Sequence, residues 1–380
     1  LAVENTLPVT AELDARFEDV RVAFEAVLAA DARSTRQGAG ASFAVWHQGT
    51  RVVHLYGGYQ DKAAQIPWAD DTLACVYSSG KAVVAMLIAQ AVQAGTVNYE
   101  TPVAEIWPAF ASGGKSTVTL GQVLSHQAGL PGFVKPVDPA IWLDWDATCA
   151  ALAAAAPLWT PGEAQGYHPQ TFGFLAGEPL RRKTGQSVGA LIRKKSLDVY
   201  CGMDNTIAAR TATMVKPPKA PDLGEINPAT KAAFLERWSA PTSVARADWL
   251  AAEIPASNMH ATADGLAAFV HPLANSGKDV NGKILLENDV LGEFYRTRSH
   301  RADQVLPYML SWGAGMMHNV NKHFGPNDGA MGHAGFGGSM VMVDPDHQIS
   351  ASFVMNRMSP HLVGDPRTLT LLEALYDALK

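Results

Sequence analysis

The chain has 380 residues, of which 47% are hydrophobic and 17% charged, so it can bury a large core as one large domain or two closely packed ones. Its formal net charge of −6 argues against nucleic acid or an anionic membrane surface as a partner. The Ala-rich stretch 147–157 is too short to span a membrane, which requires about 18 or more apolar residues.

The N-terminal region predicts one helix followed by a β-hairpin. Apolar residues recur at helical spacing over 11–30. Two short runs at 41–47 and 51–56 are rich in apolar, aromatic and β-branched residues, as strands are. Between them, Gln48-Gly49-Thr50 is typical of a hairpin turn.

The most informative segment begins at Ser78-Ser79-Gly80-Lys81. Residues 82–92 have no polar face, which predicts a buried helix, and Gly95 provides its C-terminal stop. Ser78 and Lys81 are three residues apart and therefore neighbours on one helix face. A partly desolvated lysine has a lowered pKa and can help take the proton of a serine that attacks a substrate, while the helix N-terminus stabilises an oxyanion. The structural alternative is an N-cap serine beside a lysine whose ammonium reaches solvent.

The same Ser-x-x-Lys pattern occurs again at Ser112-Gly113-Gly114-Lys115. This copy lies in a Gly-rich stretch with no apolar helix behind it. The sequence therefore predicts a solvated loop there, and the pattern alone does not identify a catalytic pair.

A third motif, Gly185-Gln186-Ser187-Val188-Gly189, matches the nucleophile elbow of α/β-hydrolases. That elbow requires a buried strand before the serine, whereas residues 178–184 are largely charged. The preferred interpretation is a helix that ends at Gly185 and a new helix that begins after it. An α/β-hydrolase that uses Ser187 remains an alternative.

The C-terminal region mirrors the N-terminal one, with predicted strands at 339–343 and 349–355 around a turn at 344–347, and a helix over 366–379. Together the two ends predict an α+β fold. In it, an antiparallel sheet built from both chain ends is flanked by terminal helices, and a mainly helical domain is inserted. The predicted division is 1–73 with 285–380 for the sheet domain and 74–284 for the inserted domain, with the active site in the cleft between them.

Several motifs in this order resemble the serine β-lactamase and penicillin-binding-protein superfamily, and more narrowly its family VIII carboxylesterases, which are related to class C β-lactamases. The motifs are Ser78-x-x-Lys81, the segment Val118–Gly132 with His126, Trp159-Thr160-Pro161-Gly162 before Tyr167, Ser257–Ala263, and Gly332–Ser339. Each motif is weak alone, but the order is specific, and the resemblance covers nearly the whole chain.

The resemblance implies a role for each of these segments. Lys81 and Tyr167 would form the general-base pair for Ser78, and the backbone amides of Ser78 and Phe336 the oxyanion hole. His333, Gly335 and Trp159 are the expected substrate contacts. A tyrosine acting as a base near neutrality requires about 4 kcal/mol of stabilisation of its anion, which Lys81 would partly supply.

The chain departs from the lactamase pattern at two places. Tyr167-His168-Pro169 lacks the asparagine of Tyr-x-Asn, and His333-Ala334-Gly335 replaces Lys-Thr-Gly. The second change removes a cation that recognises carboxylates. Both departures favour neutral esters over β-lactams.

The sequence therefore predicts a serine carboxylesterase that hydrolyses short-chain esters through an acyl-enzyme on Ser78. It needs no cofactor or metal, and its only predicted partner is the small-molecule ester. The alternatives are a β-lactamase or D-alanyl-D-alanine peptidase with the same residues, the Ser187 hydrolase, and a non-enzymatic member that binds a ligand in the cleft. The oligomeric state is not predicted.

The expected location is the cytoplasm. Three widely spaced cysteines, Cys75, Cys149 and Cys201, are an odd number and fit reduced thiols. No basic leader is visible at Leu1, although a removed segment remains open because the sequence does not begin with Met.

Overall fold

The structure is a computed structural model that describes residues 7–35 and 37–380. Residues 1–6, on which the expectation about a leader depends, lie outside the described residues. Within the described part, no helix has both the length and the apolar character that crossing a membrane requires. The three cysteines are buried free thiols.

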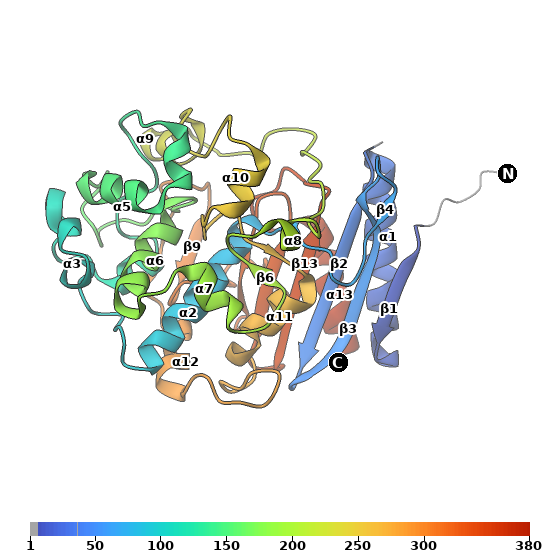
Figure 1. Cartoon of the computed structure of the whole chain (residues 1–380). Coiled ribbons are helices and arrows are strands. Elements are labelled where there is room, and N and C mark those ends of the chain that lie inside the picture. Colours follow the sequence, from blue (N-terminus) through green and yellow to red (C-terminus); the bar gives the residue numbers. More distant parts are fainter. Residues whose placement is uncertain (1–6, 36) are drawn as a thin grey trace.

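One antiparallel sheet joins the two ends of the chain (Figure 1). Its order is β1-β3-β2-β13-β12-β11-β10-β9-β8, with β4 paired to β3. The N-terminal and C-terminal halves meet where β2 pairs with β13. The strands are β1 Val9–Leu13, β2 Gly40–His47, β3 Thr50–Asp61, β4 Ile66–Pro67, β8 Ser299–Ala302, β9 Met309–Trp312, β10 Met317–His318, β11 Met331–Ala334, β12 Met340–Asp344 and β13 Ile349–Met355.

Helices cover both faces of this sheet. The terminal helices α1 (Glu18–Ser34) and α13 (Pro366–Ala378) pack against each other on one face, and α11 (Ala263–Val270) packs on β2 and β13 from the other (Figure 1). The predicted sheet from both chain ends with flanking terminal helices is confirmed. Helix α11 belongs to the segment 74–284, which was predicted as the inserted domain, but it packs on the sheet. The predicted domain boundaries stay a prediction.

The N-terminal prediction was right for the hairpin and wrong for the helix. The turn between β2 and β3 places Gln48 and Gly49 at positive φ, which matches the twist of the flanking strands. Residues 11–30 do not form one helix, because Val9–Leu13 pairs with the edge of β3 and a 3₁₀ turn at Ala15–Phe17 precedes α1. Edge pairing here outweighs the local helical spacing.

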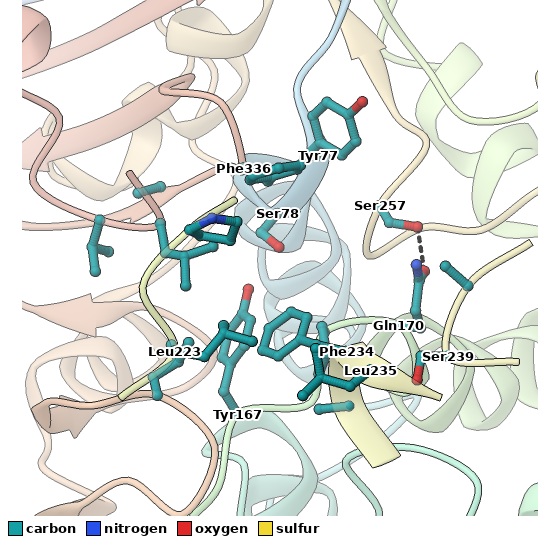
Figure 2. A pocket seen from close by; sticks show the side chains of 18 of the residues that line it. Tyr77, Ser78, Tyr167, Gln170, Leu223, Phe234, Leu235, Ser239, Ser257 and Phe336 are labelled. Carbon is teal, nitrogen blue, oxygen red and sulfur yellow. Dashed lines mark hydrogen bonds between the residues drawn. The ribbon is translucent and has the colours of Figure 1, made fainter. Parts of the chain in front are cut away.

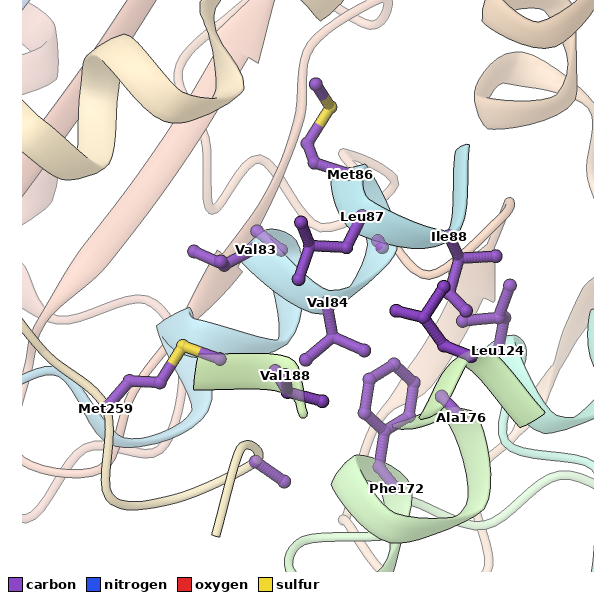
Figure 3. Packing of buried hydrophobic residues seen from close by; sticks show 14 of the residues in the cluster. Val83, Val84, Met86, Leu87, Ile88, Leu124, Phe172, Ala176, Val188 and Met259 are labelled. Atoms are coloured by element: carbon purple, nitrogen blue, oxygen red, sulfur yellow. The ribbon is translucent and has the colours of Figure 1, made fainter. Parts of the chain in front are cut away.

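The helical part is organised around α2 (Lys81–Gln93), in which every residue from Lys81 to Ala89 is buried. This confirms the predicted buried helix, and Figure 3 shows its side chains packed against those of neighbouring elements. The other helices are α3 Val103–Ile106, α4 Leu120–Leu124, α5 Trp145–Ala154, α6 Thr171–Thr184, α7 Val188–Arg193, α8 Asn205–Ala208, α9 Pro228–Thr230, α10 Arg246–Ala251 and α12 Asn288–Tyr295. A small sheet joins β5 Ala74–Cys75, β7 His260–Ala261 and β6 Val199–Tyr200.

The second Ser-x-x-Lys copy is not the solvated loop that the sequence predicted. Lys115 is fully buried, and its Nζ donates to the carbonyl oxygens of Ser112, Ala153 and Ala155. Two of these carbonyls lie at the C-terminal end of α5, where backbone oxygens lack helical partners and a cation is favoured. Lys115 therefore caps the C-terminal end of α5. The Gly-rich sequence around Lys115 gives no sign of this distant contact.

Candidate active site

Ser78 lies on a 3₁₀ turn, Tyr77–Gly80, that leads directly into α2. Tyr77 adopts φ 44°, a left-handed conformation that is unfavourable for a residue with a bulky side chain. Strain of this kind is retained where the surrounding structure imposes it, often at functional sites. Here it places Ser78 at the wall of a cavity of about 490 Å³ (Figure 2).

Lys81 is fully buried and contacts three oxygen atoms. Its Nζ donates to Ser78 Oγ and to the carbonyl oxygens of Pro169 and Ala256, each at 2.9 Å. Burial holds the pKa of Lys81 well below its usual value. The three contacts suit both protonation states: an ammonium donates to all three oxygens, and a neutral amine donates to the two carbonyls and turns its lone pair toward the Ser78 hydroxyl.

Tyr167 is buried on the opposite side of Ser78 from Tyr77, with its hydroxyl directed toward Ser78 (Figure 2). Burial raises the pKa of Tyr167 above its usual value, and its contact with the Ser78 side chain acts in the opposite direction. Lys81 Nζ lies 4.8 Å from the centre of the Tyr167 ring, a cation–π distance. The direction of the pKa shift makes Tyr167 a neutral phenol at neutral pH, opposite to the lowering that a tyrosine base requires.

The backbone around Tyr167 is fixed by buried polar groups. Asp303 Oδ1 accepts the amide hydrogen of Tyr167 at 2.9 Å. His168 turns away from the cavity: its amide donates to His126 Nδ1 at 3.1 Å, and its own Nε2 accepts from the amide of Leu130 at 3.0 Å. His168, the middle residue of Tyr167-His168-Pro169, is therefore structural, and so is the hydrogen bond that His126 accepts from it. Pro169 stands where the lactamase pattern has asparagine.

The loop after β11 reaches the turn that carries Ser78. Ser339 Oγ donates to the carbonyl oxygen of Val76 at 2.7 Å, and Ser79 Oγ donates to that of His333 at 3.3 Å. A Cβ on Gly335 would lie 2.2 Å from Val76 O, so only glycine permits this approach. Within the described residues, neither the Ser78 nor the Phe336 amide donates to another protein group, which leaves both free for an oxyanion.

His333 lines the cavity from β11, beside Tyr167 and Trp312. Burial, with a smaller effect of Lys81, lowers the pKa of His333 to about 3, so its ring is neutral at physiological pH. Neither ring nitrogen has a hydrogen-bond partner among the described residues. A neutral ring that faces the cavity can donate or accept one hydrogen bond from a bound molecule.

Trp159 was predicted to contact substrate, but the structure does not place it in the cavity wall. Its ring packs against Gly166 and lies edge-on to His168, with 6.1 Å between ring centres. Gly166 would clash with Trp159 if it carried a Cβ. Trp159 therefore supports the loop of Tyr167 from behind.

Much of the cavity wall was not identified from the sequence. The segment 217–255, which includes the π-helical turn Lys231–Leu235, supplies Leu223, Phe234 and Leu235. Gln170 and Ser257 also line the cavity (Figure 2). None of the described lining residues is Asp, Glu, Lys or Arg. No sequence signal marked the apolar residues, because only the folded chain brings them beside Ser78.

The nucleophile-elbow alternative is excluded. Ser187 follows helix α6, not a strand, and is the N-cap of α7, where its Oγ accepts from the Ala190 amide. Its hydroxyl donates to Glu253 Oε1 at 2.7 Å. Gly185 ends α6 in the left-handed conformation, as the sequence predicted.

Over the described residues, no cluster of His, Cys, Asp and Glu is suited to a metal ion.

Comparisons with known proteins agree with this fold. The Beta-lactamase family matches residues 22–375. The esterase/beta-lactamase LipL of Mycobacterium tuberculosis is 31% identical over 352 residues, which cover 86% of this chain and 79% of LipL. A solved penicillin-binding-protein homologue from Caulobacter crescentus is 43% identical with a TM-score of 0.92, covering 98% of this chain and 100% of that one. A solved family VIII carboxylesterase is 34% identical with a TM-score of 0.88, covering 98% and 100%. With its fold, its Ser78–Lys81 pair and these matches, the chain belongs to the β-lactamase family.

Proposed function

We propose that the protein is a serine carboxylesterase that forms an acyl-enzyme on Ser78. The observation that carries this proposal is the environment of Lys81, whose Nζ lies 2.9 Å from Ser78 Oγ. Lys81 is buried and has no carboxylate partner among the described residues, so its neutral form is favoured. A neutral amine beside a serine hydroxyl is a base placed to activate the nucleophile.

In the proposed reaction, Ser78 Oγ attacks the ester carbonyl carbon while its proton moves to Lys81 Nζ. The Ser78 and Phe336 amides donate to the oxyanion, a contact that strengthens as negative charge develops. The bond to the alcohol then breaks, and the alcohol oxygen takes a proton from Tyr167, which recovers one from Lys81. Water attacks the acyl-enzyme and gives a proton to Lys81 Nζ, which passes it to Ser78 Oγ as the bond between Oγ and the acyl carbon breaks and the carboxylic acid leaves. These steps use only groups of the protein and water.

The proposed substrates are short-chain neutral esters. A cavity of about 490 Å³ with a mainly apolar wall suits a small ester. β-Lactams and D-alanyl-D-alanine peptides both carry a carboxylate, and burying a carboxylate without a cation is unfavourable. Hydrolysis of β-lactams by the same residues remains a second candidate, favoured by the similarity to LipL, whose name gives both activities.

The test compares p-nitrophenyl butyrate with a chromogenic cephalosporin in wild type, Ser78→Ala and the matched control Ser187→Ala. We expect ester turnover to disappear in Ser78→Ala and to persist in Ser187→Ala, because Ser187 serves as a helix cap outside the cavity. The cephalosporin rate then ranks the two candidate activities. Ester turnover that survives Ser78→Ala would contradict the proposal, and a higher kcat/KM for the cephalosporin would reverse the ranking.

A further inference from the structure

We propose that the side chains of Gln170 and Ser257 recognise an oxygen atom of the substrate that accepts a hydrogen bond. The preferred substrates would then be neutral esters with a ketone, amide carbonyl, ether or hydroxyl oxygen separate from the reacting ester group. This inference rests on the proposed function and narrows its substrate class.

Gln170 and Ser257 are the polar side chains of the cavity wall that neither the chemistry nor the fold uses. Ser78 and Tyr167 take part in the proposed reaction, and His333, which lies beside Tyr167, can meet a bound molecule close to them. The hydroxyl of Ser239 already donates to Ala232 O at 2.9 Å and accepts from the Glu236 amide at 3.1 Å. The Tyr77 hydroxyl faces Met358 Sδ at 3.8 Å. Away from Ser78, Tyr167 and His333, the polar side chains of the wall that remain available to the rest of the substrate are Gln170 and Ser257.

The hydrogen bond within the pair leaves a donor free. Ser257 Oγ donates to Gln170 Oε1, as the dashed line in Figure 2 marks. Gln170 Nε2 then keeps two N–H groups that no described residue accepts, and the side chain is only partly buried. Gln170 occupies the N-cap position of α6, but its side chain makes no capping hydrogen bond, so the helix does not use this amide. A substrate that covers the amide without an acceptor strips it of water and leaves it unpaired, whereas a substrate with an acceptor restores the bond.

The position of the pair is fixed relative to Ser78. Lys81 Nζ donates to the carbonyls of Pro169 and Ala256, the residues immediately before Gln170 and Ser257. The amine that contacts Ser78 therefore also holds the two backbone segments that carry the pair. Asn258 fixes the second segment further, since its Oδ1 accepts from the Ile254 amide at 2.9 Å. Because the backbone of both residues is already fixed, little conformational entropy is lost when a substrate binds to this pair.

The surroundings favour a neutral acceptor over a carboxylate. No described residue that lines the cavity is Lys or Arg, and the nearby wall consists of residues such as Phe234 and Leu235 (Figure 2). An anion would lose its hydration there without gaining a counter-ion. A ketone, amide, ether or hydroxyl oxygen needs only the N–H that Gln170 offers.

The test uses two pairs of esters that differ by one carbonyl oxygen. The acyl pair is p-nitrophenyl 4-oxopentanoate and p-nitrophenyl pentanoate, and the alcohol pair is 4-oxopentyl butanoate and pentyl butanoate. For each pair, the kcat/KM ratio of the oxo ester to the plain ester is measured in wild type and in Gln170→Leu. Because intrinsic reactivity is the same for both proteins, it cancels when the two ratios are compared.

We expect Gln170→Leu to lower the ratio of one pair by about 2- to 10-fold, the range of one neutral hydrogen bond. The pair that responds tells whether the acyl or the alcohol part meets Gln170. Ser239→Ala, on the same wall, is the matched control and should leave both ratios unchanged. Unchanged ratios in Gln170→Leu, with or without a lower melting temperature, would overturn the inference and reduce the pair to a structural latch. A different result would contradict the proposed function: no turnover of any of the four esters, or turnover that persists in Ser78→Ala. Because this inference rests on the proposed function, either result would overturn both.

Discussion

Arg367 Nη2 donates to the carbonyl oxygen of Gly337 at 2.6 Å, which ties helix α13 to the loop that carries the Phe336 amide. The same guanidinium pairs with Asp365 at the start of α13 and with Asp31 on α1, both at 2.7 Å. The amide of Ser359 donates to the same Gly337 oxygen at 2.9 Å. The terminal helices therefore hold the proposed oxyanion hole from behind, although neither helix lines the cavity.

Arg367→Met is expected to lower both stability and turnover. Removing one partner of a mostly buried ion pair costs about 3–5 kcal/mol, since Asp31 and Asp365 are left uncompensated. Displacement of the loop by about 1 Å would lower kcat by up to about 100-fold. Chemical denaturation and ester kinetics measure the two effects. Arg21→Met, which breaks ion pairs on the partly exposed face of α1, is the control and should leave kcat unchanged.

Gly335→Ala tests the close approach of the loop after β11, which carries the proposed oxyanion donor Phe336, to the turn that carries Ser78. The new Cβ would meet Val76 O and Ser339 Oγ, each at 2.2 Å, so the loop must move. We expect a loss of about 100-fold or more in kcat, similar to the loss of one oxyanion donor. Gly292→Ala on α12 is the matched control, because its Cβ meets no atom within 4 Å and helical alanine is favoured. Equal activity of the two variants would show that the loop does not need this contact.

The burial of Lys81 predicts a pH dependence of stability. Because its folded pKa is lowered, the unfolded chain binds more protons between that value and about 10.4, so its contribution to stability rises with pH across this window. The free energy of unfolding is measured against pH in wild type, Lys81→Met and Ser78→Ala. The rise should be reduced in Lys81→Met and retained in Ser78→Ala, which the proposed function also expects to be inactive but which keeps the buried lysine. The same slope in all three proteins would contradict a lowered pKa.

How far the sequence predicts the site depends on how local each interaction is. The sequence predicts that Ser78 and Lys81 lie close together, because they are three residues apart at the start of a helix. The contiguous apolar residues that follow predict that this helix is buried. Ser187 was correctly assigned to a helix start for the same reason. The local pattern predicts a solvated loop at Lys115 wrongly, because the carbonyl oxygens that accept from its Nζ belong to the end of α5, about forty residues further along the chain.

The same rule holds for the fold: elements whose pairing is local in the sequence were predicted, and those whose pairing is distant were not. The hairpin of β2 and β3 and that of β12 and β13 are local, and both were found. The strands β8 to β11 were not predicted as part of the sheet, since each is short and paired only in the folded chain. Leu223 and Phe234 reach the cavity wall through the path of the segment 217–255 in the folded chain, which its local sequence pattern does not predict. Family resemblance supplied Tyr167 and Phe336, which no local pattern marks.

The pH profile of ester hydrolysis distinguishes Lys81 from His333 as the group that sets its acidic limb. His333 has a pKa lowered to about 3, so it stays neutral over the range in which the protein is assayed, whereas Lys81 must lose its proton before it can act as a base. We therefore expect kcat/KM to rise with pH as Lys81 deprotonates and to level off below the usual lysine pKa of about 10.4. His333→Asn removes the ring but keeps a neutral polar group, so it should change the height of the profile and leave the midpoint of its acidic limb in place. A midpoint that moves by more than about one pH unit in His333→Asn would mean that the imidazole itself titrates in the active enzyme, since the two neutral side chains affect Lys81 alike.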